Sequence, residues 1–427
     1  MTKSIKLALA AAMTMGATSA FATNGDNLIG TGAKSRAMGG TGIAHFNGSE
    51  SATSNPALIT KSKGTHWSFG GTYFRPDVEV ITEDAAIPGG GGATANGGTY
   101  KSEAQHNVIP YVALTENLGN GYAVGLSMYG SAGMGTDWRG ETPDIDLTDG
   151  DTTDDTFGLY DMRSNLLLLK FSVPVAYGQD NWSVGIAPVL MYGSLDMAFK
   201  TPGVNGVGFP DGSTVSTGNG SSGSFGLGLE LGASYTLPDM GLTLGAIYHS
   251  SIEMEYQDQI STAATAFGLS FDNKLEQPAE YGLGIDWTEG DISVTADWKN
   301  IRWGNARGYE NFGWENQNVY ALGAEYRYND LALRAGFNYA KNPIVATDGT
   351  GAGGSINTLN HVLFPAVTER HYTLGAGYQF TKNVGADFAV TYALSPDVKA
   401  ETGSAGLGNM TVTNDQFAFS ANLNYSF

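Results

Sequence analysis

Apolar and polar residues alternate with a period of two along most of the chain after residue 65. The clearest stretch is the last one, where one face carries Phe417, Phe419, Ala421, Leu423, Tyr425 and Phe427 and the other is mainly polar. Such alternation predicts a β-strand whose two faces meet different environments. The pattern recurs and predicts about 14 strands, an even number as in bacterial barrels, at residues 66–75, 104–116, 121–131, 163–177, 181–199, 223–236, 241–257, 276–288, 291–302, 315–328, 331–341, 367–380, 384–395 and 414–427.

The polar faces of these strands carry charges of both signs, among them Glu230, Glu280, Asp297, Lys299, Glu325, Arg334 and Asp387. A charge that faces lipid at mid-depth costs about 2–4 kcal/mol for Arg or Lys, so we expect these faces to point inward. Short turns such as 179–181 and 329–330 alternate with long connections such as 137–162 and 342–367. The pattern predicts an all-β fold, a transmembrane antiparallel β-barrel. A soluble secreted β protein that hides its apolar faces is the alternative.

The first 65 residues lack this alternation. Residues 1–22 have the features of a secretory signal peptide, with Lys3 and Lys6, an apolar run over residues 7–15 and Ala20-Phe21-Ala22 before the cleavage point. Residues 23–65 are rich in Gly, Ser, Asn and Ala and contain too few apolar residues for a core of their own. A disordered tail is one interpretation. We instead predict a plug inside the lumen of a barrel formed by residues 66–427.

Composition narrows the function. The chain has 60 Gly, 21 Tyr and no Cys, and its net charge of −20 argues against nucleic acid as a partner. The six His are scattered and no Gly-x-Ser-x-Gly elbow occurs, so we expect no enzyme and no cofactor. A barrel enzyme such as an outer-membrane lipase is the alternative from another class, and an adhesive barrel is a third. Residues 218–223 match a dinucleotide fingerprint in letters only, since the segment precedes a strand.

The connection at residues 137–161 is strongly acidic. It holds Asp144, Asp146 and Asp149, but their spacing differs by one residue from that of an EF-hand loop and the closing Glu is absent. We therefore predict no metal site, and expect a solvated loop that contacts lipopolysaccharide through divalent ions. Three apolar residues of the same loop are candidates for an initial ligand groove: Phe157, Leu159 and Tyr160.

Two wall segments are candidates for a transport path. The third predicted strand is interrupted by Tyr129, Gly130, Ser131, Ala132 and Gly133, which predict a kink because glycine inside a strand marks a bend or bulge. The alternative is an ordinary strand end. In the fourth strand the alternation turns Leu166, Leu168 and Lys170 inward, where Lys170 could hold a ligand carboxylate. The alternative interpretation pairs Lys170 with a neighbouring acid above a small apolar patch.

The N-terminal region resembles the FadL-type outer-membrane transporters of long-chain fatty acids and other hydrophobic compounds. The resemblance rests on Gly30, Gly32, residues 35–40 (SRAMGG), the triplet Asn55-Pro56-Ala57, and the Tyr-x-x-Pro-Asp-Val of residues 73–78. Beyond residue 140 it rests on architecture. It implies ligand-sensing roles for Thr23, Asn24 and Gly25, and we expect Arg36 and Asn55 to fasten the plug to the wall.

The resemblance also implies a function. A hydrophobic ligand would adsorb between the extracellular loops and enter the barrel, and movement of the plug would let it leave sideways at the kinked third strand. Lateral exit suits such ligands because apolar surface in water costs about 25 cal/mol per Å². We predict a monomeric, multi-pass protein of the bacterial outer membrane that takes up long-chain fatty acids, with aromatic or aliphatic hydrocarbons as the alternative substrates.

Overall fold

The computed structural model describes residues 24–87, 92–146, 151, 153–204, 210–218, 220–403 and 407–427. The predicted signal peptide and Thr23 therefore lie outside the described residues. The strands are β1 (Thr65–Thr82), β2 (Ala85–Ala86), β3 (Thr94–Ala95), β4 (Thr99–Lys101), β5 (Asn107–Gly119), β6 (Tyr122–Asp137), β7 (Arg163–Ser172), β8 (Val175–Gln179), β9 (Trp182–Val204), β10 (Pro210–Thr217), β11 (Ser222–Leu237), β12 (Leu242–His249), β13 (Glu280–Glu289), β14 (Ile292–Ile301), β15 (Gln317–Tyr328), β16 (Leu331–Ala340), β17 (Arg370–Gln379), β18 (Val384–Leu394), β19 (Val398–Ala400) and β20 (Met410–Ser426).

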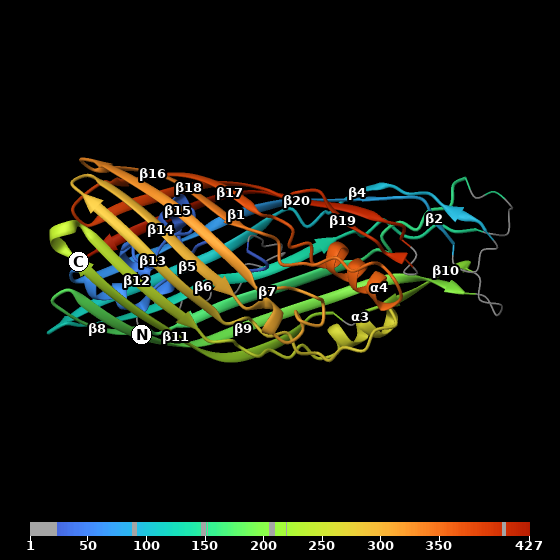
Figure 1. The fold of residues 1–427 in the computed structure, drawn as a ribbon, viewed down its shortest axis with the longest axis horizontal. Helices are drawn as coiled ribbons and strands as arrows, with labels where there is room; N and C mark the ends of the chain where they lie inside the picture. The colour runs from blue at the N-terminus through green and yellow to red at the C-terminus, as the bar shows by residue number, and fades with distance from the viewer. Residues whose placement is uncertain are drawn as a thin grey trace.

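These strands close into an antiparallel barrel (Figure 1). Each wall strand pairs with the next wall strand along the chain, and β1 pairs with both β5 and β20, which completes the ring; β2 and β3 form a separate two-stranded sheet. Pro174 divides one wall strand into β7 and β8, because proline lacks the N–H that a ladder needs. With β4, β10 and β19 counted as extensions above the ring, the described wall has 14 strands. The predicted strand number and fold class are confirmed.

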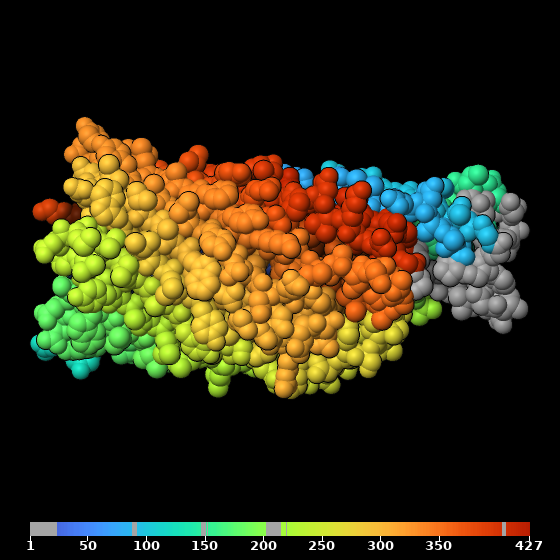
Figure 2. Space-filling model, viewed as in Figure 1, coloured from blue at the N-terminus to red at the C-terminus, as the bar shows by residue number. Residues whose placement is uncertain are grey.

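The alternation of the sequence sorts side chains as predicted. Outward apolar residues are exposed, as at Leu227, Leu374 and Phe419, while the inward acids Glu230 and Asp297 are buried. Side chains of consecutive strands cover the face seen in Figure 2, and β2 and β4 extend beyond the barrel at the end that carries the long connections. This distribution is that of a wall with lipid outside and polar groups inside.

The helices of the described residues are short, and none forms part of the wall. They are α2 (Ala33–Ala37), η1 (Gly48–Thr53), η2 (Pro56–Lys61), η3 (Pro238–Met240), α3 (Ile260–Ala266), η4 (Trp303–Asn305), α4 (Ala352–Thr358) and the π-helix η5 (Leu359–Leu363). Of these, α3, η4, α4 and η5 belong to long connections between strands. No helix among the described residues is long and apolar enough to cross a bilayer.

Residues 24–62, here called the N-terminal segment, lie against the inner wall. The hydroxyl of Thr373 accepts from the Gly39 amide at 3.0 Å, and Asp297 accepts from the amides of Gly42 and Ile43 at 2.8 and 3.0 Å. Glycine in the wall permits this approach, since a Cβ on Gly336 would lie 2.1 Å from the Gly39 nitrogen. The barrel wall thus provides the packing surface and the hydrogen bonds that the N-terminal segment cannot provide for itself.

One predicted strand is shorter in the structure. The range 241–257 was expected to be continuous, but β12 ends at His249 and the next residues turn inward. Ile252 and Met254 are buried against β11, where Gly226 and Gly228 leave room for them. Their apolar side chains continue the alternation of the strand but belong to the lumen, which the period alone could not reveal.

Candidate functional site

An apolar chamber lies inside the half of the barrel that carries the long connections. It is lined by Met134, Leu166, Leu195, Ile260, Leu275, Tyr309, Phe312, Trp314, Asn360 and Phe364. Their side chains come from β6, β7, β9, α3 and three long connections, so the wall and the loops build it together. The free volume is about 10 Å³, room for one water molecule. A ligand can therefore enter only if side chains move.

Aromatic rings form one side of this chamber. Trp303, Tyr309 and Trp314 pack on one another with ring centroids 4.6 to 5.1 Å apart. Residues 304–314 lie between the predicted strands 291–302 and 315–328, and the alternation gives no sign of this cluster. The density of aromatic residues between Trp303 and Trp314 was the signal that could have revealed it, since aromatic side chains bury the largest apolar area per residue.

The loop and wall residues predicted to meet ligand lie in or near the chamber. Leu166 lines it, and Leu168 is buried in the same apolar cluster. Phe157, Leu159 and Tyr160 are buried in that cluster too, without lining the chamber. The structure thus brings the loop together with the inward face of β7, as a ligand route requires.

The start of the N-terminal segment borders the chamber. Gly25 lies against the Trp303 ring, so closely that a Cβ at this position would come within 2.6 Å of two ring carbons. Asp26 is fully buried; its Oδ2 accepts from the Tyr309 hydroxyl and, at 3.0 Å, from Gln277 Nε2. Burial raises the pKa of Asp26 to about 6. Tyr309 therefore connects the chamber wall to the N-terminal segment.

The wall changes at Tyr129–Gly133, the predicted kink. Tyr129 is the last β6 residue that pairs with β5, and the β5 residues 107–110 pair with β1 alone among the described strands. A bulge at Ser131 shifts the register between β6 and β7. On the side that faces β5, the edge of β6 beyond Tyr129 therefore pairs with no strand among the described residues, which leaves a gap in the hydrogen-bonded wall.

The N-terminal segment provides the backbone hydrogen bonds to β6 that β5 does not make beyond Tyr129. The Leu28 amide donates to the Ser131 carbonyl at 3.2 Å, and the Gly133 amide donates to the Asp26 carbonyl at 3.1 Å. Asn27 and Ala132 face each other between these two bonds as an antiparallel bridge. Side chains of Leu28, Phe74 and Ile109 pack together beside them. Unpaired backbone groups at membrane depth are costly, so this contact seals the gap.

Lys170 lies at the same depth in the barrel as this gap, but its ammonium group already has a partner. Its Nζ is 3.0 Å from Glu230 Oε1, and the two side chains are 14% and 3% exposed. Asn27 Nδ2 donates to the nearby Glu280 at 2.9 Å. The arrangement matches the alternative interpretation, in which Lys170 pairs with a nearby acid; Glu230 lies on β11, the strand beyond β9.

The predicted fastening residues contact the wall or cap local structure. Asn55 accepts from the Ala57 amide at 3.0 Å and donates to the carbonyls of Ile43 and Ala233 at 2.7 and 3.2 Å, with Pro56 opening η2. Arg36 is 2% exposed, and burial lowers its pKa to about 10. Asn55 thus joins two parts of the N-terminal segment to β11.

We expect Asn55→Ala to loosen the N-terminal segment while the barrel stays intact. The substitution leaves buried backbone groups without partners, which costs about 1–3 kcal/mol, so cleavage of residues 40–62 by a protease should accelerate about tenfold or more. The rate is measured in detergent-purified protein, with Asn300→Ala on the outer wall as the control. Equal cleavage rates in the two variants would contradict this role.

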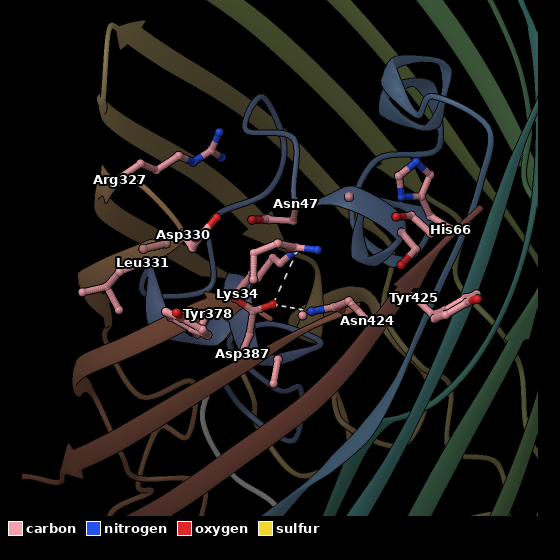
Figure 3. Close-up of a pocket in the computed structure, with 18 of the residues that line it drawn as sticks. Lys34, Asn47, His66, Arg327, Asp330, Leu331, Tyr378, Asp387, Asn424 and Tyr425 are labelled. Atoms are coloured by element: carbon pink, nitrogen blue, oxygen red, sulfur yellow. Dashed lines mark hydrogen bonds and ion pairs between the residues drawn. The ribbon is translucent and has the colours of Figure 1, made fainter. Parts of the chain in front are cut away.

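The opposite end of the lumen holds a polar cavity of about 540 Å³ (Figure 3). Arg334 is buried there between Glu325 and Asp387, at 2.6 Å from each. Lys34 of α2 lies 3.7 Å from Asp387, and Asn424 donates to the same carboxylate at 2.5 Å. Glu50 accepts from the amides of Lys34 and Ser35, and burial raises its pKa to about 7. These charges fasten α2 to the wall.

Comparison with known proteins identifies the family. The family model described as outer membrane protein transport protein (OMPP1/FadL/TodX) matches residues 8–427. The chain belongs to this family. It is thus an outer-membrane transport protein and not an enzyme, and the family resemblance and the location predicted above are confirmed.

Individual proteins and solved structures are similar to this chain. Outer membrane protein P1 of Haemophilus influenzae is 24% identical over 93% of this chain and 94% of its own. A 75-residue stretch is 45% identical to an uncharacterized protein of Chlorobium limicola, of which it covers 37%. A FadL homologue of Pseudomonas aeruginosa has the same fold, with a TM-score of 0.71, 18% identity and coverage of 94% and 100% of the two chains. The structure of the P. putida toluene transporter TodX has a TM-score of 0.66 and 22% identity, with coverage of 94% of this chain and 99% of TodX.

Proposed function

We propose that this protein takes up neutral hydrophobic molecules, with residues 24–28 as the gate and the gap between β5 and β6 as a lateral exit. The observation that carries the proposal is the double role of this gate. Its residues border the apolar chamber and also provide the hydrogen bonds that close the edge of β6. A ligand that shifts the aromatic cluster of Trp303, Tyr309 and Trp314, against which Gly25 and Asp26 lie, would thereby weaken the seal beside Gly133.

The nature of the chamber supports neutral ligands. None of its ten lining residues is charged, and an apolar molecule gains about 25 cal/mol for each Å² it removes from water. TodX, which shares the fold, is a toluene transporter. Long-chain fatty acids are the alternative, but Lys170, the cation considered for their carboxylate, is already paired with Glu230.

Uptake by cells that express the full chain tests this function. Cells with the protein should take up labelled toluene faster than cells without it. Deletion of Asn24–Gly40 removes the gate, so uptake should no longer be gated by the ligand. The double variant Lys170→Gln with Glu230→Gln removes both charges together and should leave toluene uptake unchanged. Oleate uptake that exceeds toluene uptake and collapses in the double variant would contradict the proposal.

A further inference from the structure

Each side chain of the chamber that carries a hydrogen-bond donor already donates to a protein acceptor. Three of its ten lining residues carry donor groups. Tyr309 donates its hydroxyl to Asp26, Trp314 Nε1 donates to Asn360 Oδ1 at 3.0 Å, and Asn360 Nδ2 donates to the Phe312 carbonyl at 2.7 Å. The remaining lining side chains are aliphatic, aromatic or thioether groups. A ligand carboxylate would thus lose its hydration in a chamber whose lining residues include no cation and whose donor groups already have protein acceptors.

The chamber does retain an acceptor. The Tyr309 hydroxyl donates to Asp26, its oxygen accepts from Gln277 Nε2 at 3.2 Å, and a phenolic oxygen can accept further. Asp26 is fully buried, and the charged side chain that acts on its carboxyl group among the described residues is another acid, Glu280. The Asp26 Oδ1 atom has no partner. The chamber therefore borders an electron-rich pair that lacks a compensating cation.

We propose that the Tyr309–Asp26 pair sets the ligand preference: the chamber takes hydrophobic molecules that carry a hydrogen-bond donor, phenols being the simplest class, and rejects carboxylates. The ligand hydroxyl donates to the Tyr309 oxygen, whose own hydroxyl donates to Asp26. Hydrogen bonds in such a chain polarise one another, most strongly in a site that excludes water. This inference rests on the proposed function, because the ligand has to occupy the chamber that the gate borders.

Binding of three ligands of similar shape tests the preference. Detergent-purified full-length protein is titrated with 4-ethylphenol, ethylbenzene and 4-ethylbenzoate, and heat release or tryptophan fluorescence reports binding. We expect the phenol to bind about tenfold more tightly than ethylbenzene, the value of one hydrogen bond linked to a charged group. Ethylbenzoate should bind most weakly. Equal affinity for all three, or tightest binding of the benzoate, would overturn the inference.

Substitutions at the pair give a second, independent test. Tyr309→Phe removes the acceptor and should abolish the preference for the phenol while ethylbenzene binding is kept. Tyr256→Phe is the matched control, because Tyr256 is buried close to Asp26 but does not line the chamber and its hydroxyl has no partner. It should leave the preference unchanged. A preference that survives Tyr309→Phe would contradict the assignment.

The substitution Asp26→Asn separates the effect of the carboxylate charge from the effect of the side-chain shape, because the two side chains have nearly the same shape. Its amide can keep a hydrogen bond with Tyr309 but no longer polarises it, so the phenol preference should fall and the benzoate should bind more tightly than in the natural protein. An unaltered rank order of the three ligands would overturn the inference. Failure of this test leaves the proposed function standing if toluene uptake still depends on residues 24–40, so the two outcomes are distinguishable.

Discussion

Oxidation of a cysteine pair at positions 27 and 132 is expected to abolish uptake, and reduction is expected to restore it. Asn27 and Ala132 face each other in a pair flanked by, but not joined by, backbone hydrogen bonds. The Cα atoms of such pairs lie about 4.5 Å apart, within the range that a disulfide spans. The protein has no cysteine of its own, so Asn27→Cys with Ala132→Cys would lock the gate to β6 without side reactions.

A second cysteine pair controls for the covalent bond itself. Thr72 and Ser420 are partners in β1 and β20, and their hydroxyls are 2.7 Å apart. A disulfide there joins two wall strands and should leave uptake unchanged. The single variant Asn27→Cys accounts for the lost contact with Glu280. Full uptake of labelled toluene by the oxidised 27–132 protein would refute the gating role of residues 24–28.

Arg334→Ala is expected to lower the free energy of unfolding by about 3–5 kcal/mol. Arg334 is 5% exposed and lies 2.6 Å from both Glu325 and Asp387. Removal of the cation leaves two buried carboxylates close together, each stripped of part of its hydration. Urea unfolding of the barrel in lipid vesicles, followed by tryptophan fluorescence, measures the change.

Arg327 provides the matched comparison. It lies 2.6 Å from the same Glu325, but its side chain is 59% exposed. Exposed ion pairs contribute about 0.2–1 kcal/mol, so Arg327→Ala should have a small effect. Replacement of Arg334 by Met together with Glu325→Gln and Asp387→Asn should recover much of the lost stability. Equal effects of the two arginine variants would show that burial of the pair does not determine its contribution.

The barrel could be predicted from the sequence because the pattern that specifies a membrane strand lies in neighbouring residues. A strand between lipid and lumen repeats every two residues, and the terminal stretch of β20 carries that signal in adjacent positions such as Phe417 and Phe419. The inward acids Glu230 and Asp297 followed from the cost of charge in lipid. Strand ends were less certain: residues 250–256 continue the pattern of β12, yet they fold into the lumen to fill space beside Gly226 and Gly228.

The candidate site could be predicted from the sequence only in part. Leu166 and the kink at Gly130 follow from the alternation and its interruption, because both lie in one strand. The contact between Asp26 and Tyr309 joins residues 283 positions apart, and no local pattern relates them. The partner of Lys170 depends equally on the register of β7, β9 and β11. Asp26 itself lies in a segment without periodicity, where the sequence offers no sign of burial.

Hydrogen exchange at the seal tests the account most directly. The protein in lipid nanodiscs is compared with and without saturating toluene, and mass spectrometry follows peptides that contain residues 24–30 and 130–136. We predict that ligand accelerates exchange at the amides of Leu28 and Gly133, which bond the N-terminal segment to β6, while the β14–β15 wall stays protected. Exchange at Leu28 and Gly133 that is unchanged by a bound ligand would contradict a gate at this position.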